Sequence, residues 1–305
     1  MWIKKPGKIN ENLDFLGTFK NCLYLLKGND YMIIGGGMAT AAPALDKQLS
    51  SILTEPERLK YLIILHSHFD HCGAVPYLKR KFPNMQILAS AYTAEVFAKE
   101  KVINSINSYN KRMIDKLGLQ DEYEKLDLKF DGITVDRLVK ENDMIDLSGG
   151  IKAFVIEVPG HTKCSLALYI PALKALFPSD SLPIPFECKG QLYYFTSPQY
   201  SFTAYKESLS KLAKYEVDIC AFEHQGVFID KDAVNVLNEG KMEVARYEKK
   251  IIDMFARTSD LDELAEEYAT EAAEIYKLDF LDRDTMIAIN RAEIRSVLRD
   301  AGLIE

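Results

Sequence analysis

The 305-residue chain has few cysteines, and their placement argues against two roles that cysteines often have. They are odd in number, form no Cys-X-X-Cys pair, and are scattered at Cys22, Cys72, Cys164, Cys188 and Cys220. A disulfide framework is therefore not expected, and a reducing cytoplasm is the predicted location.

Long apolar runs are also lacking. The basic residues near the start, Lys4, Lys5 and Lys8, are not followed by an apolar stretch, so no secretory signal is expected. The longest apolar stretches, such as residues 62–65, are far too short to cross a membrane. Internal repeats and low-complexity segments are missing as well. The sequence therefore predicts a folded protein that makes no membrane contact.

Clusters of positive charge are missing too. The chain has 38 Lys and Arg against 45 Asp and Glu, which gives a net charge of −7, and the basic residues are spread along it. Enzymes that act on nucleic acids usually present a basic face to the phosphates. We therefore expect a small-molecule substrate and no nucleic-acid partner, although a local basic patch could hide within an acidic total.

Short apolar runs alternate with helical patterns through most of the chain. The runs that predict strands are residues 22–26, 31–34, 61–65, 86–89, 151–158, 164–170, 175–177 and 218–222. Helices are predicted over residues 43–53, 74–82 and 204–214, and over 91–117 with an interruption around 104–110. This mixture predicts an α/β layered fold.

The character of the chain changes after about Lys231, where everything to the end is predicted to be helical. Ser259 begins a helix signal, with acidic residues following in the first turn. We therefore predict a catalytic domain over residues 1–230 and a C-terminal helical region over 231–305 that packs near the active site. Alternative roles for this region are a lid, a homodimer interface or a surface for a protein partner.

The most informative run is HSHFDHCG, which starts at His66 and directly follows a strongly apolar strand. His66 and His68 can project to the same side of an extended chain. Asp70 and His71 follow where the chain turns toward the next helix. Three imidazoles and a carboxylate within six residues form a dense set of ligands for a divalent metal such as zinc.

This His-X-His-X-Asp-His spacing resembles the signature of the metallo-β-lactamase superfamily. The resemblance implies an αββα sandwich, in which two mixed sheets are flanked by helices. It also points to His161 in VPGHT, to Asp180 after residues 176–179, and to His224 before a glycine. All five histidines of the chain fall in these motifs, which supports the set independently.

The resemblance implies a site for two divalent metal ions. One ion would take His66, His68 and His161, and Asp180 would bridge to the second ion. The ligands of the second ion would be Asp70, His71 and His224. A hydroxide between the ions would be the nucleophile, and Asp70 would orient the attacking water. His and Asp ligands accept zinc or iron, with manganese as a further possibility.

Two motifs depart from the pattern of the superfamily. Ser179 precedes Asp180 where a glycine is usual, and Glu223-His224-Gln225-Gly226 replaces Pro-Gly-His-Gly. Both changes leave the predicted ligands, Asp180 and His224, in place. We expect the loop shape and the hydrogen bonds around the bridging position to differ.

The flanking segments narrow the resemblance further. Residues 5–8 with 13–17, 70–78 and 83–90 look like those of the bacterial quinolone signal-response thioesterases. This implies a dinuclear iron site and activity on an aroylacetyl-CoA-type thioester, while similarity to glyoxalase II implies a glutathione thioester. We expect hydrolysis of a thioester, ester or lactone. A phosphodiesterase, and a regulatory protein with secondary hydrolase activity, are the alternatives.

Aromatic side chains crowd the segment between the last two ligands. They are Tyr193, Tyr194, Phe195, Tyr200 and Phe202. They are expected either to line an apolar substrate pocket or to cover the sheet and seat the C-terminal helices.

Glycines mark two further places. Gly73 would allow close approach of the backbone just after the metal-binding run. The triplet Gly35-Gly36-Gly37 lacks the spacing of a dinucleotide-binding loop, so a tight turn at the sheet edge is expected there.

Overall fold

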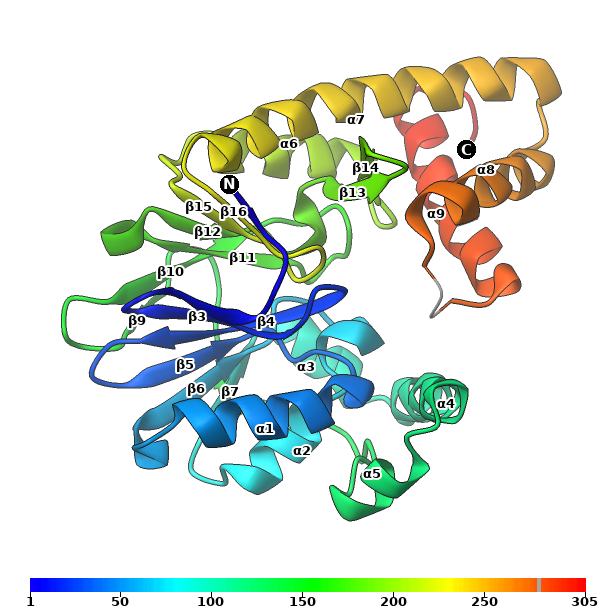
Figure 1. Cartoon of the computed structure of the whole chain (residues 1–305). Helices are drawn as coiled ribbons and strands as arrows, with labels where there is room; N and C mark the ends of the chain where they lie inside the picture. The colour runs from blue at the N-terminus through cyan, green and yellow to red at the C-terminus, as the bar shows by residue number, and fades with distance from the viewer. Residues whose placement is uncertain (279–280) are drawn as a thin grey trace.

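Two seven-stranded sheets lie face to face in the part of the chain that the structure describes, residues 1–278 and 281–305 (Figure 1). In this computed structural model the strand order of the first sheet is β2 (Gly7–Asn10), β3 (Leu13–Thr18), β4 (Asn21–Lys27), β5 (Tyr31–Ile34), β6 (Leu59–Ile63), β7 (Gln86–Ala89) and β8 (Arg137–Leu138). The order of the second is β1 (Trp2–Ile3), β16 (Val227–Ile229), β15 (Ile219–Ala221), β12 (Ala175–Phe177), β11 (Leu166–Ile170), β10 (Lys152–Glu157) and β9 (Met144–Asp146). Each sheet contains both parallel and antiparallel pairs.

The alternation of side chains along the strands explains why the sheets stack. Along β4, Tyr24 and Leu26 enter the core between the two sheets. Leu23 and Leu25, on the other face, join the core beneath the covering helices. A strand with both faces apolar must be covered on both sides. The predicted αββα sandwich is therefore confirmed.

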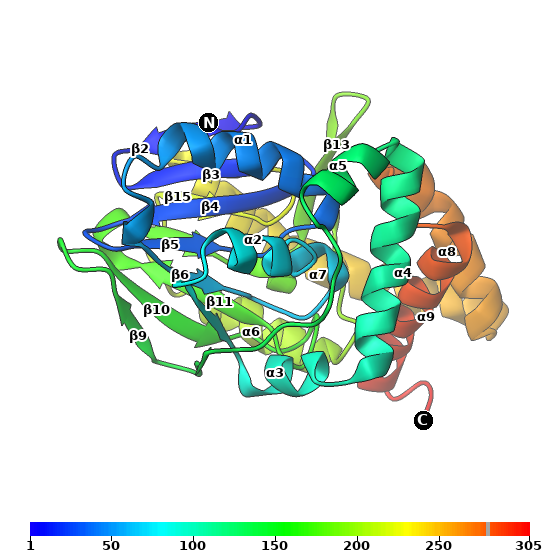
Figure 2. The same ribbon diagram turned by 90° about the horizontal axis from the view of Figure 1, so that it is seen from below.

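Helices cover the outer faces of both sheets (Figures 1 and 2). On the side of the first sheet lie α1 (Ala42–Ile52), α2 (Val75–Lys81), α3 (Ala91–Phe97), α4 (Glu100–Leu117) and α5 (Gln120–Lys125). On the second sheet lie α6 (Phe202–Leu212) and α7 (Lys231–Thr258). Among the described residues no helix has the length and apolarity that a membrane span requires.

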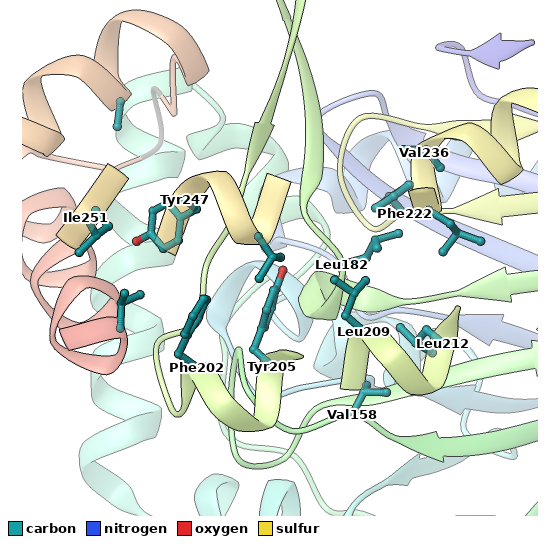
Figure 3. Packing of buried hydrophobic residues seen from close by; sticks show 14 of the residues in the cluster. Val158, Leu182, Phe202, Tyr205, Leu209, Leu212, Phe222, Val236, Tyr247 and Ile251 are labelled. Carbon is teal, nitrogen blue, oxygen red and sulfur yellow. The ribbon is translucent and has the colours of Figure 1, made fainter. Parts of the chain in front are cut away.

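The C-terminal part of the chain is helical, as the sequence predicts. It comprises α7, α8 (Leu261–Tyr276) and α9 (Arg283–Asp300), while residues 279–280 of the predicted helical region lie outside the described residues. Buried residues of these three helices share one core with α6 and the second sheet (Figure 3). The domain boundary at residue 230 stays a prediction.

Two details of the predicted helices need correction. Ser259 does not begin a helix but ends α7, and Asp260 caps α8 by accepting from the backbone of Asp262 at 2.8 Å. The break in the long helical segment falls at residues 98–99, and residues 104–110 are continuous helix. There the side chain of Asn107 bonds the backbone of Phe130 instead of competing with the helix.

A β-hairpin that the sequence analysis did not predict stands apart from both sheets. It pairs β13 (Ile184–Cys188) with β14 (Gln191–Phe195). Its turn places Lys189 and Gly190 at φ of 51° and 78°, as a tight two-residue hairpin turn requires. Phe186 and Phe195 pack their rings against Tyr276 of α8, with centroids 5.2 and 5.0 Å away. The hairpin therefore joins the sandwich to the C-terminal helices.

Candidate metal centre

The carboxyl ends of four strands deliver the predicted ligands to one place. His66 follows β6 of the first sheet, and the short turn Phe69–His71 comes directly after it. From the second sheet, His161 follows β10, Asp180 follows β12 and His224 follows β15. Strand ends are where α/β folds collect functional side chains. Residues up to 158 positions apart in the chain thus meet at one edge of the sandwich.

Close backbone contacts hold the first ligand loop in place. A Cβ on Gly73 would lie 2.8 Å from the backbone of Ala39 and of Phe69, so only glycine fits there, as predicted. A Cβ on Gly36 would lie 2.5 Å from the carbonyl oxygen of His71, whose oxygen accepts from the Gly36 amide at 3.0 Å. The glycine triplet is thus a contact surface for the ligand loop as well as a turn.

Two groups of three side chains have the geometry of metal ligands. The ligand atoms of His66, His68 and His161 lie within 4.8 Å of one another, and so do those of Asp70, His71 and His224. Nε2 of His161 is 3.1 Å from Nδ1 of His68, and Nε2 of His224 is 3.0 Å from Nε2 of His71. A tetrahedral ion with bonds of about 2.1 Å separates its ligand atoms by roughly 3.4 Å. The spacing in both groups fits such an ion.

Asp180 lies between the two groups. Its Oδ2 is 3.3 Å from Nε2 of His71 and 3.9 Å from Nε2 of His224 in one group. In the other group it is 3.8 Å from Nε2 of His66 and 3.5 Å from Nε2 of His161. The second oxygen, Oδ1, is buried without a hydrogen-bond partner among the described residues. A carboxylate in this position can reach both ions.

The ring nitrogens that face away from the centre have acceptors of their own. Nδ1 of His161 lies 2.7 Å from the carbonyl oxygen of Ser197, and Nδ1 of His224 lies 2.7 Å from that of Lys20. A proton held on Nδ1 leaves the lone pair of Nε2 aimed at the centre. Nε2 of His66 is likewise buried, with no hydrogen-bond partner among the described residues.

The charges of the site suit a cation. Burial lowers the pKa of His66 well below its usual value and brings the pKa of His68 to about 3, so both imidazoles stay neutral. Burial alone would raise the pKa of Asp180, but His71 and His224 hold it well below its usual range. Burial alone would lower the pKa of His71, but the carboxylates of Glu223, Asp70 and Asp180 raise it well above its usual value. Divalent metals bind neutral imidazoles and ionised carboxylates, so an ion bound here would displace the proton of His71.

The two departures from the superfamily pattern contact each other behind the ligands. The Ser179 hydroxyl donates to Oε2 of Glu223 at 2.7 Å and lies 3.0 Å from Nδ1 of His66. The same Oε2 is 3.0 Å from Nδ1 of His71. Ser179 and Glu223 are both buried. One hydroxyl and one carboxylate therefore orient a ligand from each group.

These contacts also account for a third set of metal-ligating types, His66, His71 and Glu223, that lies within the same 4.8 Å limit. In that set the imidazoles face Glu223 with Nδ1, and the Ser179 hydroxyl lies between them. The Ser179–Glu223 hydrogen bond thus occupies this side of the rings, and Nδ1 of His71 faces the carboxylate without a hydrogen bond of its own among the described residues. The sequence had one signal for Glu223, a carboxylate at the end of the buried strand β15, which needs a partner.

A cavity of about 920 Å³ opens above the ligands. Its floor includes His68, Asp70 and Asp180, and its wall includes residues of both α4 and α9. Arg112 of α4 joins Asp282 at the start of α9 by an ion pair of 2.6 Å. The apolar wall residues are Phe69, Val102, Ile106, Tyr109, Ile184, Phe186, Phe195, Leu278, Leu281, Ala288, Ile289 and Ala292.

The predicted aromatic pocket is corrected in most of its residues. Only Phe195 lines the cavity, whereas Tyr193, Tyr194, Tyr200 and Phe202 are not part of its wall. Phe202 is buried on α6 near Tyr247 of α7 (Figure 3), and Tyr194 packs against the same core. Tyr200 is 52% exposed, and Tyr193 lies on the hairpin. The hairpin pairing, which the sequence analysis missed, places Tyr193 and Tyr194 outside the cavity wall, while Tyr200 and Phe202 lie beyond the hairpin.

The family model of the metallo-β-lactamase superfamily matches residues 16–224, more than half of the chain. The chain belongs to this superfamily. Among solved structures, the metallo-β-lactamase family protein TTHA1429 from Thermus thermophilus is similar with a TM-score of 0.67 and 16% identity, covering 97% of this chain and 95% of that one. The superfamily protein ST1585 from Sulfolobus tokodaii has a TM-score of 0.58 and 16% identity, covering 95% and 99%. These similarities show the metallo-β-lactamase fold.

The relatives found by sequence match only part of this chain. The metallo-β-lactamase fold-containing protein ST1585 from Sulfurisphaera tokodaii is 25% identical over 175 residues, or 57% of this chain and 64% of the relative. Exodeoxyribonuclease WalJ from Streptococcus pneumoniae is 24% identical over 129 residues, or 41% of this chain and 45% of the relative. The chain thus spans less than two thirds of each of these relatives.

Proposed function

We propose that this metallo-β-lactamase superfamily member is a dinuclear metal-dependent hydrolase of a thioester, ester or lactone. The observation that carries the proposal is the pair of ligand groups with Asp180 between them, at the floor of a large cavity. Two divalent ions bound there would bring the pKa of a shared water toward neutrality and stabilise negative charge on the attacked carbonyl. Zinc and iron both suit these ligands.

Asp70 is placed to hold the attacking water. Its Oδ2 lies 3.5 Å from Nε2 of both His71 and His224, and its side chain reaches the cavity. The side-chain amide of Asn21 donates to the backbone carbonyl oxygen of Asp70 at 2.8 Å and fixes the backbone there. An ionised carboxylate fixed in this way can accept a hydrogen bond from the water. That bond would direct the lone pair of the water toward the substrate carbonyl.

The walls of the cavity favour a substrate with an apolar acyl group. Aromatic and aliphatic side chains, mainly from the hairpin, α4 and α9, make up half of the lining residues, and charged groups are few. Apolar surface removed from water stabilises a bound substrate by about 25 cal/mol per Å². Together with the thioesterase-like flanking segments, this makes an apolar acyl thioester our first choice.

Metal content and substrate class test the proposal together. Purified protein should contain about two equivalents of zinc or iron by elemental analysis. Removal of the metals with a chelator should abolish hydrolysis, and their return should restore it. Hydrolysis should be measured on a substrate panel of acyl-CoA thioesters, glutathione thioesters, lactones and phosphodiesters. A folded protein that binds no metal would refute the proposal.

A phosphodiesterase is the second candidate, because the relative WalJ is an exodeoxyribonuclease. A nuclease needs basic groups to meet phosphates. The chain carries a net charge of −7, and Lys101 is the only lysine or arginine that belongs to the described cavity wall. These features favour carbonyl substrates. Faster turnover of the phosphodiesters than of the thioesters in the panel would reverse this choice.

A bulky residue on the inner wall should select against long acyl groups. Ala288 of α9 lines the cavity, so Ala288→Trp should exclude a few methylenes of a long-chain thioester. Since each buried methylene contributes about 0.8 kcal/mol, KM for that substrate should rise about 10-fold or more. KM for an acetyl thioester should change little.

The matched control is Ala301→Trp, at the exposed end of α9 and outside the cavity wall. It should leave KM unchanged for both acyl lengths. Equal KM values for the long-chain thioester in Ala288→Trp and the original protein would show that the acyl group binds elsewhere.

A further inference from the structure

One buried carboxyl group has no part in the chemistry proposed above. Glu293 lies on α9 in the C-terminal helical region and is 0% exposed. No lysine, arginine or histidine among the described residues forms an ion pair with it. Burying such a group costs stability that an apolar side chain would not cost. The position therefore calls for an explanation.

Glu293 connects to a metal ligand through one intervening residue. The Ser197 hydroxyl donates to Oε1 of Glu293, and the backbone carbonyl of Ser197 accepts from Nδ1 of His161 at 2.7 Å. Ser197 follows β14, in a segment without regular structure. Within the segment, the same carbonyl also accepts from the backbone amide of Gln199 at 3.1 Å.

The segment also has hydrogen bonds that do not involve Glu293. The amide of Gln199 donates to the Ser197 hydroxyl at 3.2 Å, and the Tyr200 amide donates to the Gly160 carbonyl at 3.0 Å. Gln199 is itself part of the cavity wall rather than of the core. The bond to Glu293 ties the segment to helix α9.

The surroundings of Glu293 keep it uncharged. Burial raises the pKa of its carboxyl to about 8, and its Oε2 has no hydrogen-bond partner among the described residues. The hydroxyls of Tyr205 and Tyr247, which lie in the core between α6 and α7 (Figure 3), are buried without partners as well. A neutral carboxyl resembles an amide in shape and in its carbonyl acceptor. Glutamine should therefore replace it closely.

We propose that Glu293 is a positioning residue for His161 and acts through Ser197. By this route the C-terminal helix α9 helps to shape the ligand group of His66, His68 and His161. The opposite group, with Asp70, His71 and His224, is oriented by Glu223 and by the carbonyl of Lys20 instead. Loss of Glu293 should therefore weaken one metal equivalent and spare the other. The inference rests on the proposed dinuclear site.

Cobalt(II) titration of the metal-free full-length protein separates the two equivalents by affinity and by visible absorption. Glu293→Leu, which removes the acceptor, should raise the dissociation constant of one equivalent about 10-fold to 100-fold, as loss of groups that orient a ligand typically does. The other equivalent should change by less than about threefold. Glu293→Gln keeps an oxygen for Ser197 and should bind both equivalents like the original protein.

Two further variants keep the test decisive. Ser296→Ala removes a buried hydroxyl of the same helix that has no partner among the described residues, and it should leave both affinities unchanged. Ser197→Ala removes the link itself and should raise the dissociation constant of the same metal equivalent. This result tests the inference even where Glu293→Leu does not fold.

Unchanged cobalt binding by folded Glu293→Leu, or by Ser197→Ala, would overturn the inference, and so would an equal loss in Ser296→Ala. A protein with the original sequence that binds no cobalt would instead overturn the proposed dinuclear site. The two failures are therefore distinguishable.

Discussion

Replacement of Asp180 by asparagine should reduce kcat by about 10³-fold or more and lower the bound metal from about two equivalents toward one. Oδ2 of Asp180 lies 3.3–3.9 Å from Nε2 of imidazoles in both ligand groups. An amide has nearly the same shape, but it is neutral and offers a single oxygen. It can neither bridge two cations nor balance their charge.

Elemental analysis and hydrolysis of the best thioester in the panel measure this effect. Asp253→Asn, the same change at an exposed position on α7, is the matched control and should behave like the original protein. Circular dichroism should give the same fold for both variants. Two tightly bound equivalents in folded Asp180→Asn would show that the ions do not share this carboxylate.

The second large effect is expected at Glu223. Leucine there would leave the Ser179 hydroxyl without its buried acceptor and would remove the carboxylate that lies 3.0 Å from Nδ1 of His71. Metal affinity should fall about 10-fold to 100-fold, because these contacts orient His66 and His71. The free energy of unfolding should fall by about 1–3 kcal/mol, the usual cost of an unsatisfied buried polar group. Glu223→Gln keeps one oxygen acceptor and should lose less of both.

Ser179 provides an independent check of the same network. It holds a φ of 53°, a conformation that favours glycine. Ser179→Gly should therefore relieve backbone strain and yet weaken metal binding, since the hydroxyl that joins His66 to Glu223 is lost. Cobalt titration and thermal unfolding measure the two quantities separately. Glu216→Leu, at an exposed surface position, is the control for loss of a carboxylate. Metal affinity of Glu223→Leu equal to that of this control would contradict the role of Glu223.

Local patterns were enough to predict most of the sandwich. The apolar runs at residues 31–34 and 86–89 match β5 and β7 residue for residue. Continuous apolar runs are stable as strands only when both faces are buried, so they also predicted covering helices. The strands β1, β2, β3, β8, β9 and β16 were missed. Of these, β1 pairs with β16 through Trp2 and Phe228, far apart in the chain, and such pairing leaves little local signal.

The hairpin β13–β14 shows why the substrate pocket was harder to predict than the ligands. Which rings face the cavity depends on strand register, because neighbouring residues of a strand point to opposite faces. Phe195 faces the cavity, and Tyr194 packs on the opposite side against the core of the C-terminal helices. The carbonyl of Tyr194 accepts from the Tyr276 hydroxyl at 3.0 Å, which fixes this register from a distant helix. Composition alone could not reveal that contact.

The sequence by itself predicted the candidate ligand set. Local spacing and residue chemistry indicated the HSHFDHCG run, whereas His161, Asp180 and His224 came from the resemblance, supported by the placement of all five histidines. Only the tertiary structure decided what surrounds these ligands. The histidines are contacted by Glu223, Ser179 and Ser197, which are as much as 152 residues away in the chain. The cavity is lined by both α4 and α9. Metal ligation demands particular residue types, which a sequence displays. Orientation and shape demand particular distances, which arise only when remote segments pack together.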